Sequence, residues 1–114
     1  MVREKRDERV AQLRKGVLEL AILALLHGNR RYGGEMVDEL AGRPGLDASA
    51  GTVYPLLTRL KTAGLVETEW QESPAGPPRK YYRLTGGGVA ALAESTRAWR
   101  DLATALDGLL EGVR

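Results

Sequence analysis

The sequence predicts a mainly α fold with one small β-hairpin, and three features of its pattern support this prediction. Three helical segments come first, two alternating segments separated by a Pro/Gly-rich stretch follow, and a heptad pattern runs toward the end of the chain. This order is that of a winged helix-turn-helix domain followed by a C-terminal dimerisation helix. We expect the winged domain over residues 10–85, the dimerisation helix over 86–114 and a basic, flexible arm over 1–9.

Capping and turn residues mark the ends of the three expected helices. Residues 10–26 should form one helix, which is apolar on nearly all sides toward its end, so neighbouring elements must cover several of its faces. Gly28 suits the left-handed cap of that helix, and a second, shorter helix is expected over 33–40. Ser49 can cap a third helix, which Gly64 ends.

The third helix has one apolar side and one polar side. Its apolar residues recur at the spacing i, i+3, i+4 and i+7, which predicts a stripe packed on the core: Val53, Leu56, Leu57 and Leu60. Pro55 lies early in this helix, where its ring crowds the carbonyl group four residues before it, that of Gly51. We therefore expect a bent first turn.

The hairpin is expected from two alternating segments. Residues 65–71 and 79–84 each alternate between apolar and polar side chains, which is typical of half-buried strands. Trp70 shares a strand face with Val66, so we expect its side chain in the core. Residues 73–78 (SPAGPP) should be neither strand nor helix, which would give the hairpin a long tip.

The last helix is expected to begin at Thr85, which can cap it, and it carries the heptad pattern. The apolar residues of the seam are Leu92, Trp99, Leu106 and Val113, which are seven positions apart, and Leu102 and Leu109, which fall three positions after Trp99 and Leu106. Such a seam needs a covering partner. Part of it should pack on its own domain, and part should meet a second copy of the chain.

Composition excludes several classes of function. The chain has no cysteine, which rules out disulfides, thiolate metal sites and a cysteine nucleophile. Its one histidine, His27, lacks companion ligands and no nucleophile–base pair is apparent, so we expect no metal, no cofactor and no enzyme activity. No apolar run is long enough to span a membrane, and a cytoplasmic location is expected.

The order of the elements suggests where double-stranded DNA would bind. In helix-turn-helix proteins the second helix of the pair enters the major groove, and its first residues reach the base edges. Ser49, Gly51 and Thr52 are small or polar residues at that place and permit close approach. Arg79 and Lys80 follow the hairpin tip, where phosphate contacts would give affinity but little sequence information.

Five motifs are spread over residues 16–106: GVLELAILALL at 16–26, YG at 32–33, GTVYPLLTRL at 51–60, GLV at 64–66 and RKYYRLT at 79–85. With these motifs, in this order and spacing, the chain resembles the PadR family of bacterial transcriptional regulators, in its short form with a single C-terminal helix. Two positions depart from the family. Gly34 stands where a second aromatic residue is often found, and Ala103 where drug-binding relatives can carry an acid.

The resemblance implies a homodimer that binds an inverted-repeat operator, represses transcription and is released by a small-molecule effector. In the multidrug-binding branch, which the chain resembles, a tryptophan of the last helix faces its mate across the dimer axis, and planar aromatic compounds lie between the two rings. Counting from the RKYYRLT motif places Trp99 at that position. Ala103 weakens the support for a cation-binding pocket, and Gly34 removes one contact expected near the DNA backbone.

The candidate DNA-binding residues are Tyr32, Ser49, Gly51, Thr52, Tyr54, Arg59, Arg79 and Lys80. Packing between helices is the alternative role of Tyr54, and pairing with an acid is that of Arg59. The candidate effector-binding residues are Trp99 and Glu19. The dimer core is the alternative place for Trp99, and a structural salt bridge is the alternative role of Glu19, the one charge in an apolar run.

A second class of function stays open at this point, namely a winged-helix module that binds protein and not DNA. The acidic residues Glu67, Glu69 and Glu72 near the hairpin favour it. Tight binding to a protein partner without retardation of a duplex at low salt would distinguish this module from a DNA-binding regulator.

Overall fold

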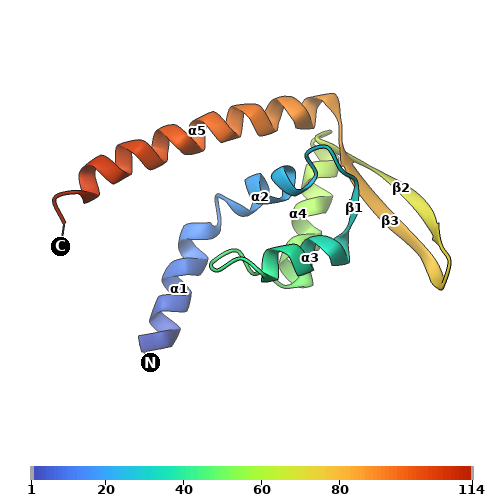
Figure 1. The fold of residues 1–114 in the computed structure, drawn as a ribbon, viewed down its shortest axis with the longest axis horizontal. Coiled ribbons are helices and arrows are strands. Elements are labelled where there is room, and N and C mark those ends of the chain that lie inside the picture. The colour runs from blue at the N-terminus through green and yellow to red at the C-terminus, as the bar shows by residue number, and fades with distance from the viewer. Residues whose placement is uncertain (1, 114) are drawn as a thin grey trace.

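The fold was analysed in a computed structural model, which describes the backbone of residues 2–113 and the side chains of residues 8–113. Its elements are, in chain order, α1 (Val2–Arg14), α2 (Leu18–Leu25), β1 (Arg31–Tyr32), α3 (Gly33–Ala41), α4 (Ala50–Thr62), β2 (Val66–Ser73), β3 (Gly76–Leu84) and α5 (Gly86–Leu110) (Figure 1). The prediction of a mainly α chain with a small hairpin and a winged helix-turn-helix order is confirmed.

The first helical segment differs from the expectation. The expectation of a single helix over 10–26 is wrong. The structure has two separate helices, α1 and α2, and Lys15, Gly16 and Val17 lie between them. A glycine inside a helix costs about 0.5–1 kcal/mol relative to alanine, which favours a break at Gly16. The backbone of α1 is helical from Val2 onward, so this helix extends into the segment 1–9 that the sequence suggested as an arm.

The core is formed where α2, α3, α4 and the sheet meet. Its fully or nearly fully buried residues are Ile22, Leu23, Leu26, Met36, Leu40, Val53, Leu57, Leu60, Val66 and Tyr82. Three of the four residues of the stripe expected on α4 are therefore in the core, and Leu56 is half-buried at its edge. The recognition segment is thus held in place through its apolar side, which leaves its opposite side to solvent.

The end of α4 is fixed by a glycine, as the sequence predicted. The amide of Gly64 donates to the carbonyl oxygen of Lys61 at 3.0 Å, and that of Leu65 donates to the carbonyl oxygen of Leu60 at 2.9 Å. This pair of hydrogen bonds requires a left-handed residue, and Gly64 has a φ of 77°. The turn directs the chain from α4 straight into β2.

The sheet has three antiparallel strands in the order β1-β3-β2. The sequence did not predict β1, whose two residues Arg31 and Tyr32 pair with Tyr82 and Tyr81 of β3. The hairpin is also longer, and its tip shorter, than expected, because β2 continues to Ser73 and β3 begins at Gly76. The segment expected to be irregular over 73–78 is therefore largely strand.

The prolines at the start of β3 are tolerated because the strand pairing is irregular there. The register of β2 and β3 shifts between Gln71 and Ser73, and Pro77 and Pro78 lie opposite this shift. Proline has no amide hydrogen to donate to a ladder, so it occurs in strands mainly at bulges and edges. The hairpin continues past this shift and reaches well beyond the helices as a wing (Figure 1).

Helix α5 begins as predicted, with Thr85 as its N-cap. The Thr85 hydroxyl accepts a hydrogen bond from the amide of Gly88 at 3.0 Å and donates one to the carbonyl oxygen of Gly64 at 2.6 Å. From this corner α5 passes α2 and projects beyond the helices, whereas the wing projects in another direction (Figure 1). Within residues 2–113, no helix combines the length and the apolar character needed to traverse a membrane.

Candidate nucleic-acid interface

A groove of about 450 Å³ lies between the start of α3, the exposed side of α4 and the wing. We call it the wing groove; it is lined by Tyr32, Gly33, Tyr54, Thr58, Trp70, Arg79, Lys80 and Tyr82. Four of the eight candidate DNA-binding residues are thereby brought together, from three separate parts of the sequence. These four are Tyr32, Tyr54, Arg79 and Lys80.

A ladder of aromatic and guanidinium groups holds Arg79 in place. The guanidinium carbon of Arg79 lies 4.6 Å from the centre of the Tyr32 ring. Tyr32 in turn packs edge-to-face on Tyr81, with ring centres 5.5 Å apart, and the guanidinium of Arg30 lies 5.3 Å from the Tyr81 ring. Such cation–π contacts orient a guanidinium and leave its N–H groups able to bind an anion.

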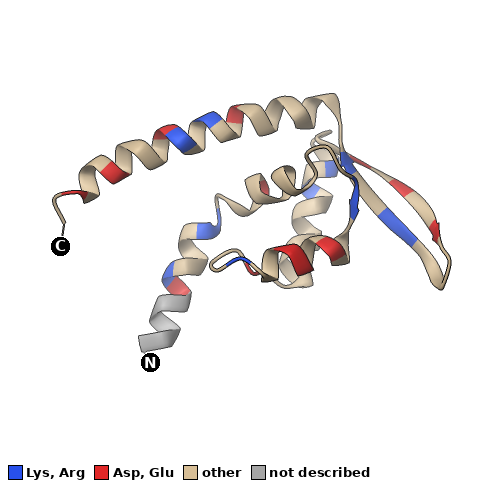
Figure 2. Ribbon diagram, in the orientation of Figure 1, with Lys and Arg blue, Asp and Glu red and all other residues tan. Residues whose placement is uncertain are grey.

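The charges of the wing are partly neutralised, and in a selective way. Glu67 pairs with Arg83 at 2.8 Å, and Glu69 pairs with Arg30 at 3.0 Å. No salt bridge among the side chains of residues 8–113 involves Arg79 or Lys80. Figure 2 shows the basic band on β3 beside the acidic positions of β2. Two of the three acids that favoured a protein-binding module are thus occupied, and Arg79 and Lys80 line the wing groove.

Tyr54 combines the two roles considered for it. Its ring packs so closely on Gly33 that a Cβ atom at position 33 would collide with it, which joins α4 to α3. Its side chain is nevertheless 44% exposed and lines the wing groove. Burial, with a further contribution from Tyr54, raises the pKa of the neighbouring Tyr82 phenol. Tyr82 is a buried residue of the core.

The start of α4 presents small, exposed residues. Ser49 occupies the N-cap position, but its hydroxyl makes no capping hydrogen bond, contrary to our expectation. Its carbonyl oxygen instead accepts from the amides of Thr52 and Val53, both at 3.0 Å. Ser49, Gly51 and Thr52 are all exposed, so a ligand can approach the backbone of this turn closely.

Arg59 lies outside the wing groove and is engaged with an acid. Its guanidinium pairs with the carboxylate of Glu19 on α2, which is the alternative that the sequence left open for both residues. The Arg59 side chain is still 63% exposed, so the pair is a surface contact of modest strength. It connects the recognition helix to the helix that carries the candidate effector residue Glu19.

The two candidate effector-binding residues lie in one apolar pocket. This pocket of about 410 Å³ is formed by the end of α1, α2 and α5, and Glu19 and Trp99 both line it. Its other lining residues are Leu13, Gly16, Val17, Leu20, Leu23, Ser95, Ala98 and Leu102. We call it the α5 pocket. Trp99 is 48% exposed there, so its ring is only half-covered by its own chain.

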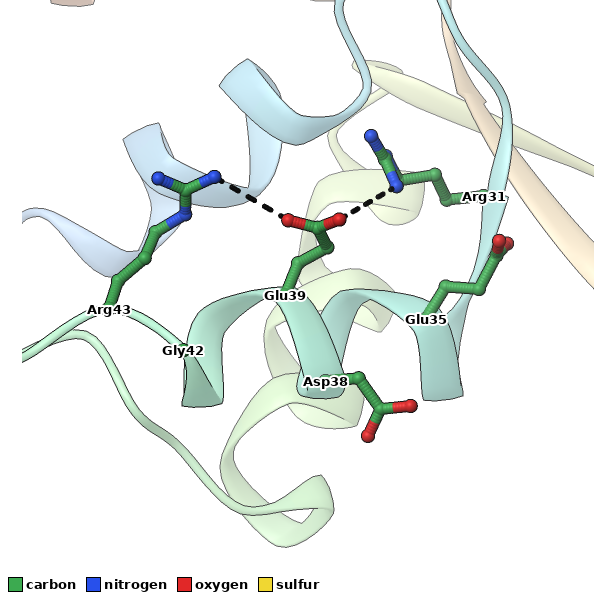
Figure 3. Close-up of a pocket in the computed structure, with 6 residues that line it drawn as sticks. All are labelled: Arg31, Glu35, Asp38, Glu39, Gly42 and Arg43. Atoms are coloured by element: carbon green, nitrogen blue, oxygen red, sulfur yellow. Dashed lines mark hydrogen bonds and ion pairs between the residues drawn. The ribbon is translucent and has the colours of Figure 1, made fainter.

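The acidic face of α3 is a third concave region, and two of its carboxylates have structural roles (Figure 3). Glu39 lies between two arginines, 3.7 Å from Arg31 and 3.5 Å from Arg43. Glu35 accepts a hydrogen bond from the amide of Tyr32 at the start of the helix. Over the part of the chain whose side chains are described, no three histidine or acidic residues are grouped so that they could hold a metal ion.

The seam expected on α5 is largely uncovered in the single chain. Leu92 packs against the core, whereas the other residues of the seam within α5 are exposed: Trp99, Leu102, Leu106 and Leu109. The helix expected over 86–114 is shorter, because α5 ends at Leu110, so Val113 is exposed beyond the end of the helix. We call the exposed residues Trp99, Leu102, Leu106 and Leu109 the α5 seam.

One residue of the interface was misplaced by the sequence. Trp70 was expected in the core, but its side chain is 67% exposed and lines the wing groove. Alternation correctly put it on the same face of β2 as the buried Val66. It did not indicate that the wing extends past the helices that cover this face.

Comparison with known proteins assigns the family. The model of the PadR-like family of transcriptional regulators matches residues 22–94, which include α3, α4 and the wing. The chain belongs to this family. Its PadR membership, predicted from the motifs, is therefore confirmed, and this regulator is a DNA-binding transcription factor and not an enzyme.

Individual relatives agree with this assignment. A Mycobacterium tuberculosis protein named as a transcriptional regulator is 38% identical over 92 residues, which cover 81% of this chain and 84% of that protein. The crystal structure of a PadR family regulator from Eggerthella lenta has a TM-score of 0.85 at 35% identity, covering 97% of this chain and 96% of the other. A PadR-like regulator from Bacillus cereus has a TM-score of 0.81 at 37% identity, with 89% and 98% covered.

Proposed function

We propose that this PadR-like regulator is a homodimeric repressor that binds an inverted-repeat operator and is released by a planar aromatic effector. The observation that carries the DNA-binding part is the wing groove, where Arg79 and Lys80 project without an acidic partner among the described residues. A groove with two cations beside an exposed helix start suits a phosphate backbone that lies next to a major groove.

The roles of the DNA-binding residues follow from their places. The exposed turn of Ser49, Gly51 and Thr52 would lie against base edges, because it begins the recognition helix and carries no bulky side chain. Tyr32 and Tyr54 would bind phosphate through their hydroxyl groups at the floor of the groove. Arg79 and Lys80 would supply most of the salt-dependent affinity.

The proposal of a homodimer rests on the α5 seam. Leu109 is 76% exposed, and it continues a line of exposed apolar residues that no described part of the chain covers. A monomeric protein rarely exposes a large continuous apolar patch, and a second α5 of the same sequence would bury it. A twofold axis between two α5 helices would also place two recognition helices on the two halves of an inverted repeat.

The effector proposal rests on the α5 pocket. An indole that is half-covered at the edge of an apolar pocket can stack on a flat aromatic compound. Glu19 lines this pocket and pairs with Arg59 of the recognition helix. A ligand that draws Glu19 away from Arg59 would therefore alter the contacts of α4, which gives the pocket a physical connection to DNA binding.

Titration of an operator duplex tests the DNA-binding part. The duplex is selected from genomic fragments with the purified protein, and Kd is measured over a range of salt concentrations. Arg79→Gln and Lys80→Gln should each weaken binding and lower the salt slope by about 1, because each removes one phosphate contact. Arg97→Gln, which removes an exposed cation of α5, is the matched control. Wild-type affinity and slope in both wing variants would refute the placement of the wing on DNA.

Fluorescence tests the effector part. In a Trp70→Phe variant, Trp99 is the only tryptophan, because the chain has two. Planar aromatic dyes should quench its emission at concentrations that also release the operator from the wild-type protein. Trp99→Phe should lose the dye-dependent release. Unchanged emission across a dye panel, with the dimer intact, would leave Trp99 as a residue of the dimer core only.

A further inference from the structure

The exposed indole of Trp70 is a feature that the proposed contacts leave unused. Trp70 lies on β2 directly opposite Lys80 of β3, and both residues line the wing groove. Its face of the strand starts in the core at Val66, which is buried, and ends at Trp70, which is 67% exposed. The sheet therefore carries its apolar face outward, past the helices, into the region where the DNA is proposed to lie.

In the wing groove, the exposed indole ring of Trp70 lies beside a positive charge. Lys80 shares the strand face of Trp70, and its ammonium lies 5.8 Å from the ring centre of Tyr82. Arg79 pairs with Gln71 and points to the opposite face of the sheet, where its guanidinium is held over Tyr32. Neither cation forms a salt bridge with the described side chains. The ligand that matches Trp70 and Lys80 has an apolar unit beside an anionic group, and a deoxyribose next to its phosphate has this form.

We propose that Trp70 is a DNA-contacting residue whose indole packs on a deoxyribose of the backbone, while Lys80, on the same face of the wing, binds a flanking phosphate. The proposal rests on the placement of the wing on DNA given above. It assigns to the wing an apolar contact that fixes how deeply the hairpin sits against the backbone, in addition to the two charged contacts.

A second copy of the chain is a less suitable occupant for this indole. The exposed apolar surface proposed for self-association lies on α5, and α5 and the wing run in different directions from their shared corner (Figure 1). A surface that buries the α5 seam would therefore leave the far part of the wing uncovered. The Lys80 ammonium beside Trp70 also favours an anionic occupant over an apolar one.

The salt dependence of binding separates an apolar contact from a charged one. Phosphate contacts release counterions and so contribute to the salt slope, whereas burial of an indole on a sugar does not. Trp70→Ala should therefore weaken operator binding roughly tenfold at every salt concentration and leave the slope unchanged. Lys80→Gln should weaken binding with a slope lower by about 1. Val89→Ala, which trims an exposed apolar residue of α5, is the matched control.

Emission from the intact residue provides a test that needs no change at position 70. In a Trp99→Phe variant, Trp70 is the only tryptophan, so saturation with the operator should shift or quench its emission. An iodide quencher should reach it less readily in the complex than in the unbound protein. Trp70→Phe, which keeps a smaller ring, should lose less affinity than Trp70→Ala.

The two proposals fail in different ways. If the wild-type protein does not bind the selected duplex, the proposed function is wrong. If the wild type binds and the wing variants weaken binding, but Trp70→Ala binds like wild type and Trp70 emission is unchanged by saturating operator, only the indole contact is overturned. Unaltered circular dichroism and melting of Trp70→Ala would show that a loss of affinity does not arise from unfolding.

Discussion

The recognition helix α4 and the last helix α5 have similar apolar stripes with opposite exposure. On α4, the stripe residues Val53, Leu57 and Leu60 are completely buried. On α5, the residues of the α5 seam are exposed, although their spacing indicates an equally apolar side. Periodicity predicts that a helix has an apolar face, but it does not indicate which molecule covers that face.

The two helices therefore differ in what covers their apolar stripes. The stripe of α4 is covered within the chain by α2, α3 and the sheet, so a single chain can position its recognition helix and wing. The α5 seam is not covered by the described part of its own chain, and each leucine side chain buried there by the proposed second copy would contribute about 1.5–3 kcal/mol before the entropic cost of association. Under the proposed function, one chain would therefore suffice to position the DNA-contacting residues, whereas the spacing of two recognition helices would depend on dimerisation.

Truncation of one leucine in each stripe should give the largest contrast. Leu57→Ala should lower the free energy of unfolding by about 2–5 kcal/mol, because it leaves a cavity in a fully buried site. Leu109→Ala should change it by less than about 0.5 kcal/mol in dilute protein, because its side chain is already mostly in water. Urea unfolding below the concentration of self-association measures both.

The contrast would fail in either of two ways. A small effect of Leu57→Ala would mean that the core of the winged domain adjusts to the loss of volume. A large effect of Leu109→Ala in dilute protein would mean that α5 packs on its own chain more than its exposure indicates. Either result would remove the distinction between an internally covered and an externally covered helix.

Much of the winged domain could be predicted because its determinants are local. Thr85 caps α5 and Gly64 ends α4, and each acts through hydrogen bonds to residues nearby in space that its own turn brings together. The apolar stripe of α4 could also be predicted, because the helical period alone sets the spacing of its residues. The position of Arg79 relative to the tip was not predicted correctly, because β3 begins at Gly76 and Arg79 lies inside this strand.

The parts that could not be predicted depend on distant residues or on lengths. The partner of Arg59 is Glu19, forty positions away, and a sequence pattern alone does not select it. Trp70 was assigned to the correct strand face but wrongly to the core, because alternation does not reveal where the helices that cover this face end. The two-residue strand β1 is too short for any periodicity, and it forms because β3 offers an edge to pair with.

A charge placed in the α5 seam should have a smaller effect, and it should weaken self-association without changing the stability of the single chain. Leu106 is 53% exposed in the single chain, so a dimer gains only about half of its side-chain burial from each copy. Leu106→Glu should therefore raise the Kd of self-association by roughly 10- to 100-fold, since the change occurs twice across a twofold interface.

Thr104→Glu is the matched control for this charge, because Thr104 is exposed on the other side of the same helix. Sedimentation equilibrium measures the Kd, and urea unfolding of dilute protein should give the same stability for both variants. Leu106→Glu should also bind a single operator half-site as the wild type does, while its affinity for the full inverted repeat falls with the dimer. Equal self-association in the two variants would mean that the second copy covers some other surface, and that the exposed seam has a different partner.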